Sequence, residues 1–249
     1  MKIIIAPAKK MSINNDTFDY ETQPQYLEKT ASLLKAMRKL SYTEAKQLWN
    51  CSDKLAEPNY KWLQQLDLEK QLSPALLAFN GIQYQYMAPD LFTQPALDYV
   101  RKNLRIISGF YGILRPFDGV VPYRLEMQSK LKVPNYDNLY EFWNSQIYTA
   151  LTNNSETIIN LASQEYAKTI TPFLKKNQKM ITVVFASIVD GKLKTKATLA
   201  KIARGEMVRY MAENNVTSIN ALKKFNHPDW LFSAELSTED RLTFIYQEK

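Results

Sequence analysis

The sequence has one cysteine and one histidine in 249 residues. A single cysteine, Cys51, excludes an internal disulfide and is typical of a protein kept in a reducing compartment. The lone histidine, His227, precedes a proline in an expected loop, so the chain offers neither a Ser–His–Asp triad nor a zinc-type His/Cys cluster. We therefore expect no metal site and no cofactor.

Long apolar runs are missing as well. The N-terminal run is only the three isoleucines from Ile3 to Ile5, which is too short for a signal peptide, and no segment reaches the length of a membrane span. These features predict a cytoplasmic protein. Because no repeat or linker-like stretch divides the chain, we expect one domain over residues 1–249. No pattern fixes the oligomeric state, and we favour a monomer.

Glycine is scarce, and three of the six glycines stand in one stretch, Arg105–Met127. The stretch reads RIISGFYGILRPFDGVVPYRLEM, and basic and aromatic side chains are interleaved in it: Tyr111, Arg115, Tyr123 and Arg124. Glycine turns beside guanidinium groups suit a phosphate-rich partner, because backbone N–H groups and arginines both bind anions. The alternative is a corner of the core in which Arg124 pairs with Glu126 or Asp118.

Within this stretch, Ser108–Leu114 resembles the hairpin of a helix–hairpin–helix. In such hairpins the amides of a glycine-rich turn reach DNA phosphates, and a nearby cation, here Arg115, anchors them. Gly109 and Gly112 lie three residues apart rather than two, so the match is incomplete.

Short β-branched runs separated by helical patterns predict a mixed α/β (α+β) fold. The expected strands are Lys2–Ala6, Leu104–Ser108, Thr157–Ser163 and Met180–Ser187, and a closing antiparallel hairpin follows Leu222. The expected helices lie in Pro24–Asn50, where Ser41 and Glu44 form a capping box, and in Pro58–Leu66, Pro95–Asn103, Asp137–Asn153 and the segment after Thr198. Leu76–Met87 reads as a strand, an Asn80–Gly81 turn and a second strand, or as a bent strand feeding a helix.

Polar side chains follow the expected strands. Lys9 comes directly after the first strand, and open α/β sheets place their ligands at the carboxyl ends of strands. Glu165 follows the third expected strand. Arg124 and Glu126 lie two residues apart, so in extended chain they share a face, where they could pair or do acid–base work. The catalytic candidates are therefore Lys9, Glu126 and Glu165.

The strongest basic region is Lys192–Arg209, with six basic residues and one acid, in a chain of net charge +7. Lys201 and Arg204 lie three apart on one face of the expected helix. This pattern is typical of a nucleic-acid footprint, although a solvated charged face would have the same composition. Gly205 inside the helix costs roughly 1 kcal/mol relative to alanine, so another part of the chain should approach closely there.

Five segments in this order resemble the YaaA family of peroxide-stress proteins: APAKK (6–10), SGFYGILRP (108–116), PYRLEM (122–127), NLASQEY (160–166) and KIARGEM (201–207). The resemblance implies a family-specific fold with a helix–hairpin–helix-like element beside a basic cleft. It also implies DNA binding, in the setting of protection against hydrogen peroxide and limitation of free iron. With one histidine and one cysteine, any link to iron would be indirect or carboxylate-based.

Two hypotheses follow. The first is backbone-directed binding of duplex or branched DNA, through Lys9, Lys10, Ser108, Gly109, Tyr111, Gly112, Arg115, Tyr123, Arg124, Lys201 and Arg204. The second is an enzyme that acts on a nucleotide or nucleic-acid base, using Lys9 and a nearby carboxylate. A binding module needs a long basic groove, whereas an enzyme needs a pocket in which Lys9 meets Glu126 or Glu165. A protein-interaction scaffold has no exposed apolar stretch to support it.

Overall fold

The computed structural model describes residues 1–14, 16–152 and 157–247. Its strands are β1 (Lys2–Ile5), β2 (Ser73–Pro74), β3 (Leu104–Ser108), β4 (Gly112–Leu114), β5 (Gly119–Val120), β6 (Thr157–Leu161), β7 (Lys179–Val189), β8 (Lys192–Lys194), β9 (Trp230–Thr238) and β10 (Arg241–Tyr246). Its α-helices are α1 (Leu27–Arg38), α2 (Tyr42–Trp49), α3 (Asp53–Gln65), α4 (Ala75–Ala78), α5 (Ile82–Met87), α6 (Gln94–Asn103), α7 (Leu139–Trp143), α8 (Gln146–Thr152), α9 (Gln164–Ala167), α10 (Ala197–Glu213) and α11 (Ile219–Leu222). Two 3₁₀ turns are η1 (Pro89–Leu91) and η2 (Thr171–Phe173).

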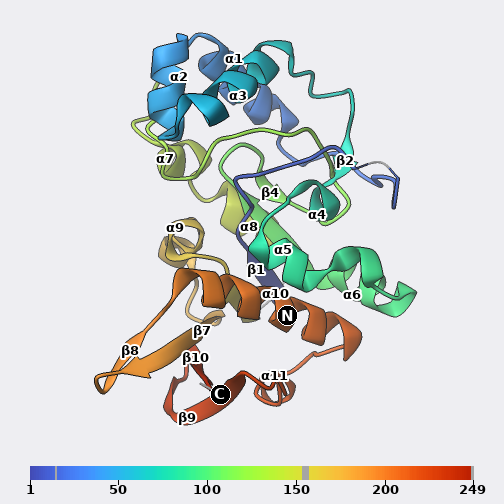
Figure 1. The fold of residues 1–249 in the computed structure, drawn as a ribbon, viewed down its shortest axis with the longest axis vertical. Coiled ribbons are helices and arrows are strands. Elements are labelled where there is room, and N and C mark those ends of the chain that lie inside the picture. Colours follow the sequence, from blue (N-terminus) through green and yellow to red (C-terminus); the bar gives the residue numbers. More distant parts are fainter. Residues whose placement is uncertain (15, 153–156, 248–249) are drawn as a thin grey trace.

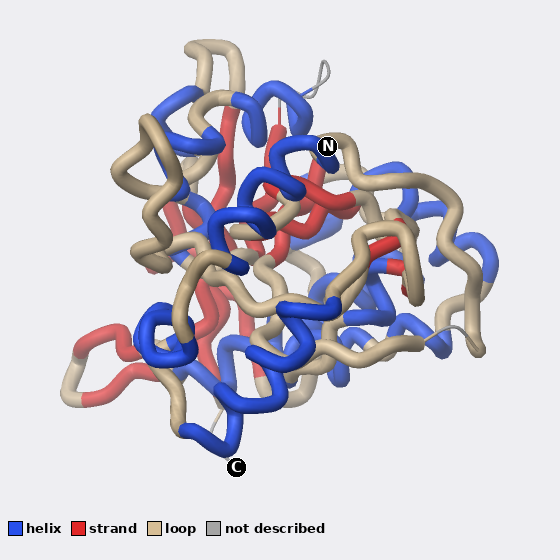
Figure 2. Tube along the Cα trace, turned by 90° about the horizontal axis from the view of Figure 1, so that it is seen from above, coloured by secondary structure: helices blue, strands red, loops and turns tan. Residues whose placement is uncertain are grey.

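An eight-stranded, mostly parallel sheet forms the centre, in the order β4-β3-β1-β6-β7-β10-β9, with β8 paired to β7. β1 lies between two parallel neighbours, so Ile4 is paired with Arg105 on one side and with Asn160 on the other. The three isoleucines of β1 are fully buried, as expected for a β-branched run inside a parallel sheet. Helices and loops surround the strands (Figure 2). The mixed α/β class is confirmed.

The strand order changes direction between β1 and β6. After β1 the chain leads to β3 on one side, whereas β6 lies on the other side of β1 and leads on to β7. The segments that leave β1 and β6 therefore diverge, which opens a crevice at the carboxyl ends of these two strands. This topological switch point is where open α/β sheets bind ligands.

The helices lie in separate groups along the molecule. Figure 1 shows α1, α2 and α3 together at one end, β8, β9, β10 and α11 at the other, and α5 and α10 between them. Ser41 caps α2 through the predicted capping box with Glu44. No helix among the described residues is long and apolar enough to span a membrane.

Three expectations differ from the structure. Strands, β3 and β4, flank the Gly109–Gly112 turn, so a helix–hairpin–helix-like element is not confirmed. Leu76–Met87 is not a strand pair, because α4 and α5 occupy most of it; of the alternative, a bent strand feeding a helix, only the helix is present. The expected helix Asp137–Asn153 is broken into α7 and α8 at Asn144, whose φ is 43° and ψ is −135°; Asn153 itself lies outside the described residues.

Candidate functional site

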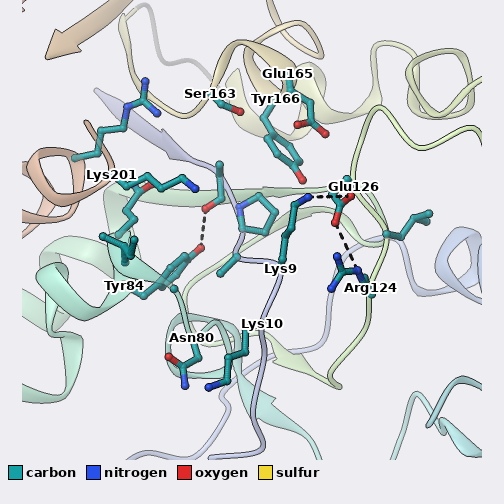
Figure 3. Close-up of a pocket in the computed structure, with 18 of the residues that line it drawn as sticks. Lys9, Lys10, Asn80, Tyr84, Arg124, Glu126, Ser163, Glu165, Tyr166 and Lys201 are labelled. Atoms are coloured by element: carbon teal, nitrogen blue, oxygen red, sulfur yellow. Dashed lines mark hydrogen bonds and ion pairs between the residues drawn. The ribbon is translucent and has the colours of Figure 1, made fainter. Parts of the chain in front are cut away.

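A pocket of about 490 Å³ opens at the switch point between β1 and β6. The segment after β1 supplies Ala6–Lys10, and the segment after β6 supplies Ser163, Glu165 and Tyr166. The remaining walls come from residues 80–84, which lead into α5, from Tyr123–Glu126, and from Lys201 and Arg204 of α10. Segments from both halves of the sequence thus meet at one place (Figure 3).

Three of the rare glycines lie where the pocket walls touch one another. A Cβ on Gly81 would lie 2.7 Å from the Cβ of Ala8, and one on Gly109 would lie 2.6 Å from the carbonyl oxygen of Leu125. A Cβ on Gly205 would overlap the carbonyl oxygen of Gln83, which confirms the close approach predicted for this helix position. The absence of side chains at these glycines lets the walls close on one another.

Lys9, Glu126 and Arg124 form the polar centre of the pocket. Lys9 Nζ lies 3.6 Å from Glu126 Oε2, and Arg124 Nε lies 4.0 Å from Glu126 Oε1 (Figure 3). The side chain of Arg124 is only 9% exposed and that of Glu126 16%, whereas Lys9 is 66% exposed. Arg124 Nε and Glu126 Oε1 are buried without a hydrogen-bond partner in the described part of the chain. Buried groups of this kind are costly unless something else satisfies them.

Glu165 is the second carboxylate of this centre. Its Oε1 accepts a hydrogen bond from the backbone N–H of Gln128 at 3.1 Å. Burial raises the pKa of Glu165, and the nearby Glu126 carboxylate raises it as well, whereas the bond from Gln128 and the Lys9 ammonium lower it. A carboxyl with a raised pKa beside a second carboxylate and a cation is a common acid–base arrangement.

The opposite wall carries hydrogen-bond donors. Gln83 is buried, and its Nε2 finds no hydrogen-bond partner among the described residues; the same holds for Arg204 Nε. Lys201 extends into the pocket from α10 (Figure 3). Tyr84 borders this wall, and its hydroxyl donates to the carbonyl of Ala6 at 2.9 Å.

The structure brings together most of the residues named from the sequence. The ones that line the pocket are Lys9, Lys10, Tyr123, Arg124, Glu126, Glu165, Lys201 and Arg204. Because Glu126 and Glu165 stand among the cations, the pocket has mixed charge, and a purely basic cleft is not confirmed. Within residues 1–14, 16–152 and 157–247, no three His, Cys, Asp or Glu side chains gather as ligands of one metal ion would.

The remaining predicted residues lie elsewhere. Ser108, Gly109, Tyr111 and Gly112 are buried. The Ser108 hydroxyl accepts the N–H groups of Phe110 at 3.1 Å and of Tyr111 at 2.8 Å. These amides therefore hold the turn itself and do not face outward toward a phosphate.

Arg115 points to a different place again. Its Nε donates to Asp118 at 3.0 Å and its Nη2 donates to the carbonyl of Gln23 at 2.9 Å. Asp118 thus pairs with Arg115, and Arg124 has Glu126 as its neighbour, which decides between the two partners left open for Arg124.

Sequence reasoning misses Gln83 and the place of Tyr84 in the pocket wall. Both belong to Leu76–Met87, which reads as a strand, a turn and a second strand or as a bent strand feeding a helix, and neither reading places them in a pocket wall. The local signal is the Asn80–Gly81 dipeptide, which marks a turn but does not say that α5 packs against α10. That packing joins residues more than a hundred positions apart.

Known proteins match this chain over nearly its whole length. The family model described as peroxide stress protein YaaA matches residues 1–236. A UPF0246 protein of Lactiplantibacillus plantarum is 62% identical over 247 residues, which cover 99% of this chain and 100% of the relative. UPF0246 proteins of Pediococcus pentosaceus (54% identical, covering 100% of this chain and 99% of the relative) and Agathobacter rectalis (46% identical, covering 98% of each) are also similar. The chain belongs to the YaaA family of peroxide stress proteins.

Proposed function

We propose that this protein serves the peroxide stress response as an enzyme that acts on a nucleotide or a nucleic-acid base, with its active site in the pocket between β1 and β6. The observation that carries the proposal is the pairing of Lys9 with Glu126, 3.6 Å apart, inside a pocket of about 490 Å³ at the topological switch point. Sequence reasoning names this convergence as the feature that separates an enzyme from a pure binding module. Pockets of this volume suit small molecules.

The proposed chemistry is proton transfer. Glu126 Oε2 lies 3.6 Å from Lys9, and the buried Oε1 has no hydrogen-bond partner among the described residues. The carboxylate is therefore placed to take a proton from a bound substrate or from water. Glu165, whose pKa is raised by burial, is suited to return one. Lys9 would stabilise negative charge that develops on the bound substrate.

The test is turnover of a nucleotide panel by the full chain, followed by liquid chromatography and mass spectrometry. The panel includes nucleosides, their mono- and triphosphates, and forms with oxidised bases, which are products of peroxide damage. We expect at least one member to be converted, with a loss of roughly 100-fold or more in Glu126→Gln. Lys39→Gln, on the distant helix–helix junction after α1, should retain full rate. If no panel member is converted, the enzyme proposal fails.

A second candidate, backbone-directed binding of duplex or branched DNA, has one specific observation in its favour. Lys192, Lys194 and Lys196 are all exposed on the β7–β8 arm and just after it, next to α10. Figure 1 shows this arm projecting from the molecule. Exposed lysines on a projecting arm can bind phosphates without distorting the fold.

Fluorescence anisotropy with duplex and four-way-junction DNA across a salt series tests this candidate. Replacing the three arm lysines by glutamine should weaken binding and make the salt slope shallower by about 0.9 for each phosphate that is no longer neutralised. The matched control replaces Lys35, Lys39 and Lys54, three exposed lysines at the helical end of the molecule (Figure 1). Equal effects of the two triple variants would mean that only net charge matters, and the arm would lose its assigned role.

A further inference from the structure

We propose that Gln83, Lys201 and Arg204 form a phosphate subsite, which holds the phosphoryl group of a small nucleotide while its base reaches Lys9 and Glu126. This inference deepens the proposed function and rests on it for the identity of the ligand. One of the three side chains comes from α5 and two come from α10.

Arg204 carries a charge that the described part of the protein does not neutralise. Burial lowers its pKa, and no carboxylate among the described residues compensates. Two other arginines have acidic partners: Arg101 pairs with Glu21 and Asp98, and Arg209 pairs with Glu213. Arg105, whose pKa is also lowered by burial, donates instead to the backbone carbonyls of Arg101 and Leu104. Arg204 is half-buried, and its Nε is buried without a hydrogen-bond partner among the described residues. A partly buried guanidinium without a counter-ion is unfavourable, so its counter-ion is expected to come from a bound anion.

Gln83 points to the same conclusion independently. It is only 7% exposed, it lines the pocket, and its Nε2 is buried without a hydrogen-bond partner within the described residues. The close approach of Gly205 to the backbone of Gln83 places it directly beside the Arg204 position of α10. The amide and the guanidinium are thus fixed on two rigid, touching helices.

The chemistry of this wall selects a phosphate. Gln83 Nε2, Arg204 Nε and Lys201 Nζ are all donors, and two of the three groups are cationic. Phosphate oxygens accept several hydrogen bonds and carry negative charge, so they match such a set, whereas a group that bears only donors would leave these atoms unsatisfied.

The pocket has two poles, which sets the orientation of the ligand. In Figure 3, Lys201 and Tyr84 lie on one side of Lys9, and Glu126 and Arg124 lie on the other. The unpartnered Glu126 Oε1 accepts hydrogen bonds, so the part of the ligand that reaches it carries N–H or O–H donors, as nucleobases do. A molecule with a phosphate at one end and a base at the other fits both poles.

Isothermal titration calorimetry on the full chain tests the subsite with four probes: inorganic phosphate, a nucleoside, its 5′-monophosphate and a single-stranded oligonucleotide. We expect the monophosphate to bind roughly 30-fold tighter than the nucleoside, as two or more charged hydrogen bonds would give. Lys201→Gln and Arg204→Met should remove most of this difference. Arg209→Gln, on the same helix but paired with Glu213, should leave it unchanged.

Folding does not confound the test. Lys201 is exposed, so its substitution removes a donor without touching the core. Arg204→Met removes a half-buried charge that has no carboxylate partner among the described residues, and we expect its melting temperature without ligand to be no lower than that of the wild type.

Each adverse outcome is distinct. Equal affinities for nucleoside and monophosphate would overturn the subsite but leave the enzyme proposal standing. Binding of phosphate and monophosphate through Arg204, without turnover of any nucleotide, would support the subsite and contradict the enzyme. An oligonucleotide that binds through Arg204 more tightly than the monophosphate would assign the wall to a nucleic-acid backbone and overturn the small-nucleotide proposal.

Discussion

Asp118 fixes a turn in the central stretch, Arg105–Met127, through its buried carboxylate. The carboxylate is 1% exposed and accepts hydrogen bonds from the Thr22 hydroxyl at 2.6 Å and from the N–H and Nε of Arg115 at 2.8 and 3.0 Å. Burial raises the pKa of Asp118, and these hydrogen bonds act against that rise. The buried charge of Asp118 therefore needs these donors, and the donors need Asp118 as their acceptor.

We predict that Asp118→Ala lowers the free energy of unfolding by about 3 kcal/mol, because it leaves a backbone N–H and a guanidinium without their acceptor. Urea titration followed by circular dichroism measures the loss. The control is Asp98→Ala, which removes an exposed i,i+3 partner of Arg101 and should cost about 0.5 kcal/mol or less. Similar losses in the two variants would show that the turn is not held by this carboxylate.

Glu165 makes stability depend on pH in a predictable direction. Its pKa is raised by burial, so the folded protein binds the proton more tightly than the unfolded chain does. The stabilisation by that proton is complete below the unfolded pKa, about 4.3, and is lost as the pH rises through the higher folded value. Glu165→Gln should therefore gain melting temperature relative to the wild type as the pH rises from 4 to 8.

The amide oxygen that Glu165→Gln introduces can still accept the N–H of Gln128, so the substitution mainly removes the charge. Glu57→Gln removes one charge from the exposed surface of α3 and serves as the control. A difference between Glu165→Gln and the wild type that stays constant over this pH range would contradict the burial argument.

At the scale of elements, the packing of α5 against α10 decides the shape of the pocket. A Cβ at position 205 would overlap the carbonyl oxygen of Gln83 and approach the N atom of Met87 to 2.9 Å. Both are backbone atoms and cannot rotate away. We predict that Gly205→Ala lowers the free energy of unfolding by about 3 kcal/mol, measured by urea titration.

Gly191→Ala is the matched control for this substitution. Gly191 has φ +70° and open space around its Cβ position, so alanine there meets only backbone strain of roughly 1 kcal/mol. If Gly205→Ala cost no more than Gly191→Ala, the two helices would be free to separate, and the rigid placement of Arg204 would no longer support a phosphate subsite.

The elements that the sequence predicts well are the ones with a local cause. β1 is a run of isoleucines, and α2 begins at a capping box, so neighbouring residues suffice to specify them. Other elements are not marked by neighbouring residues. The hydrophobic pattern around Asn144 fits one continuous helix, and that of Ile82–Met87 also fits a strand, so tertiary packing decides the structure there.

The same distinction applies to the candidate site. Lys9, Glu126 and Glu165 can be named because strand ends and alternating residues are visible in the sequence. Gln83 cannot be named in this way, because its place in the pocket depends on α10, which lies more than a hundred residues later in the chain. The burial of the Gly109–Gly112 turn also escapes prediction, since glycines that face a partner and glycines that face the protein's own backbone read alike.

At the scale of the whole molecule, α2, α3 and α7 are hydrogen-bonded to the central stretch. Three of the four tryptophan indoles donate to backbone carbonyls near or within it: Trp49 to Arg124 at 2.7 Å, Trp62 to Pro122 at 2.6 Å and Trp143 to Gly109 at 2.9 Å. The buried apolar residues of these helices and of the sheet form one core cluster. The helical end is therefore joined to the sheet by both packing and hydrogen bonds.

This connection predicts that the helical end and the sheet unfold together. In Trp230→Phe, fluorescence reports only Trp49, Trp62 and Trp143, whereas far-ultraviolet circular dichroism reports the whole chain. We expect the two urea transitions of this variant to have the same midpoint, because separating α2 and α3 from the central stretch would expose core and break two indole hydrogen bonds at once. Binding of a ligand to the pocket should move both midpoints by the same amount, because a ligand that stabilises one part of a single cooperative unit stabilises the whole unit. If the fluorescence transition came at lower urea than the circular dichroism transition, the molecule would consist of two folding units. A ligand in the pocket would then shift only the midpoint of the second transition.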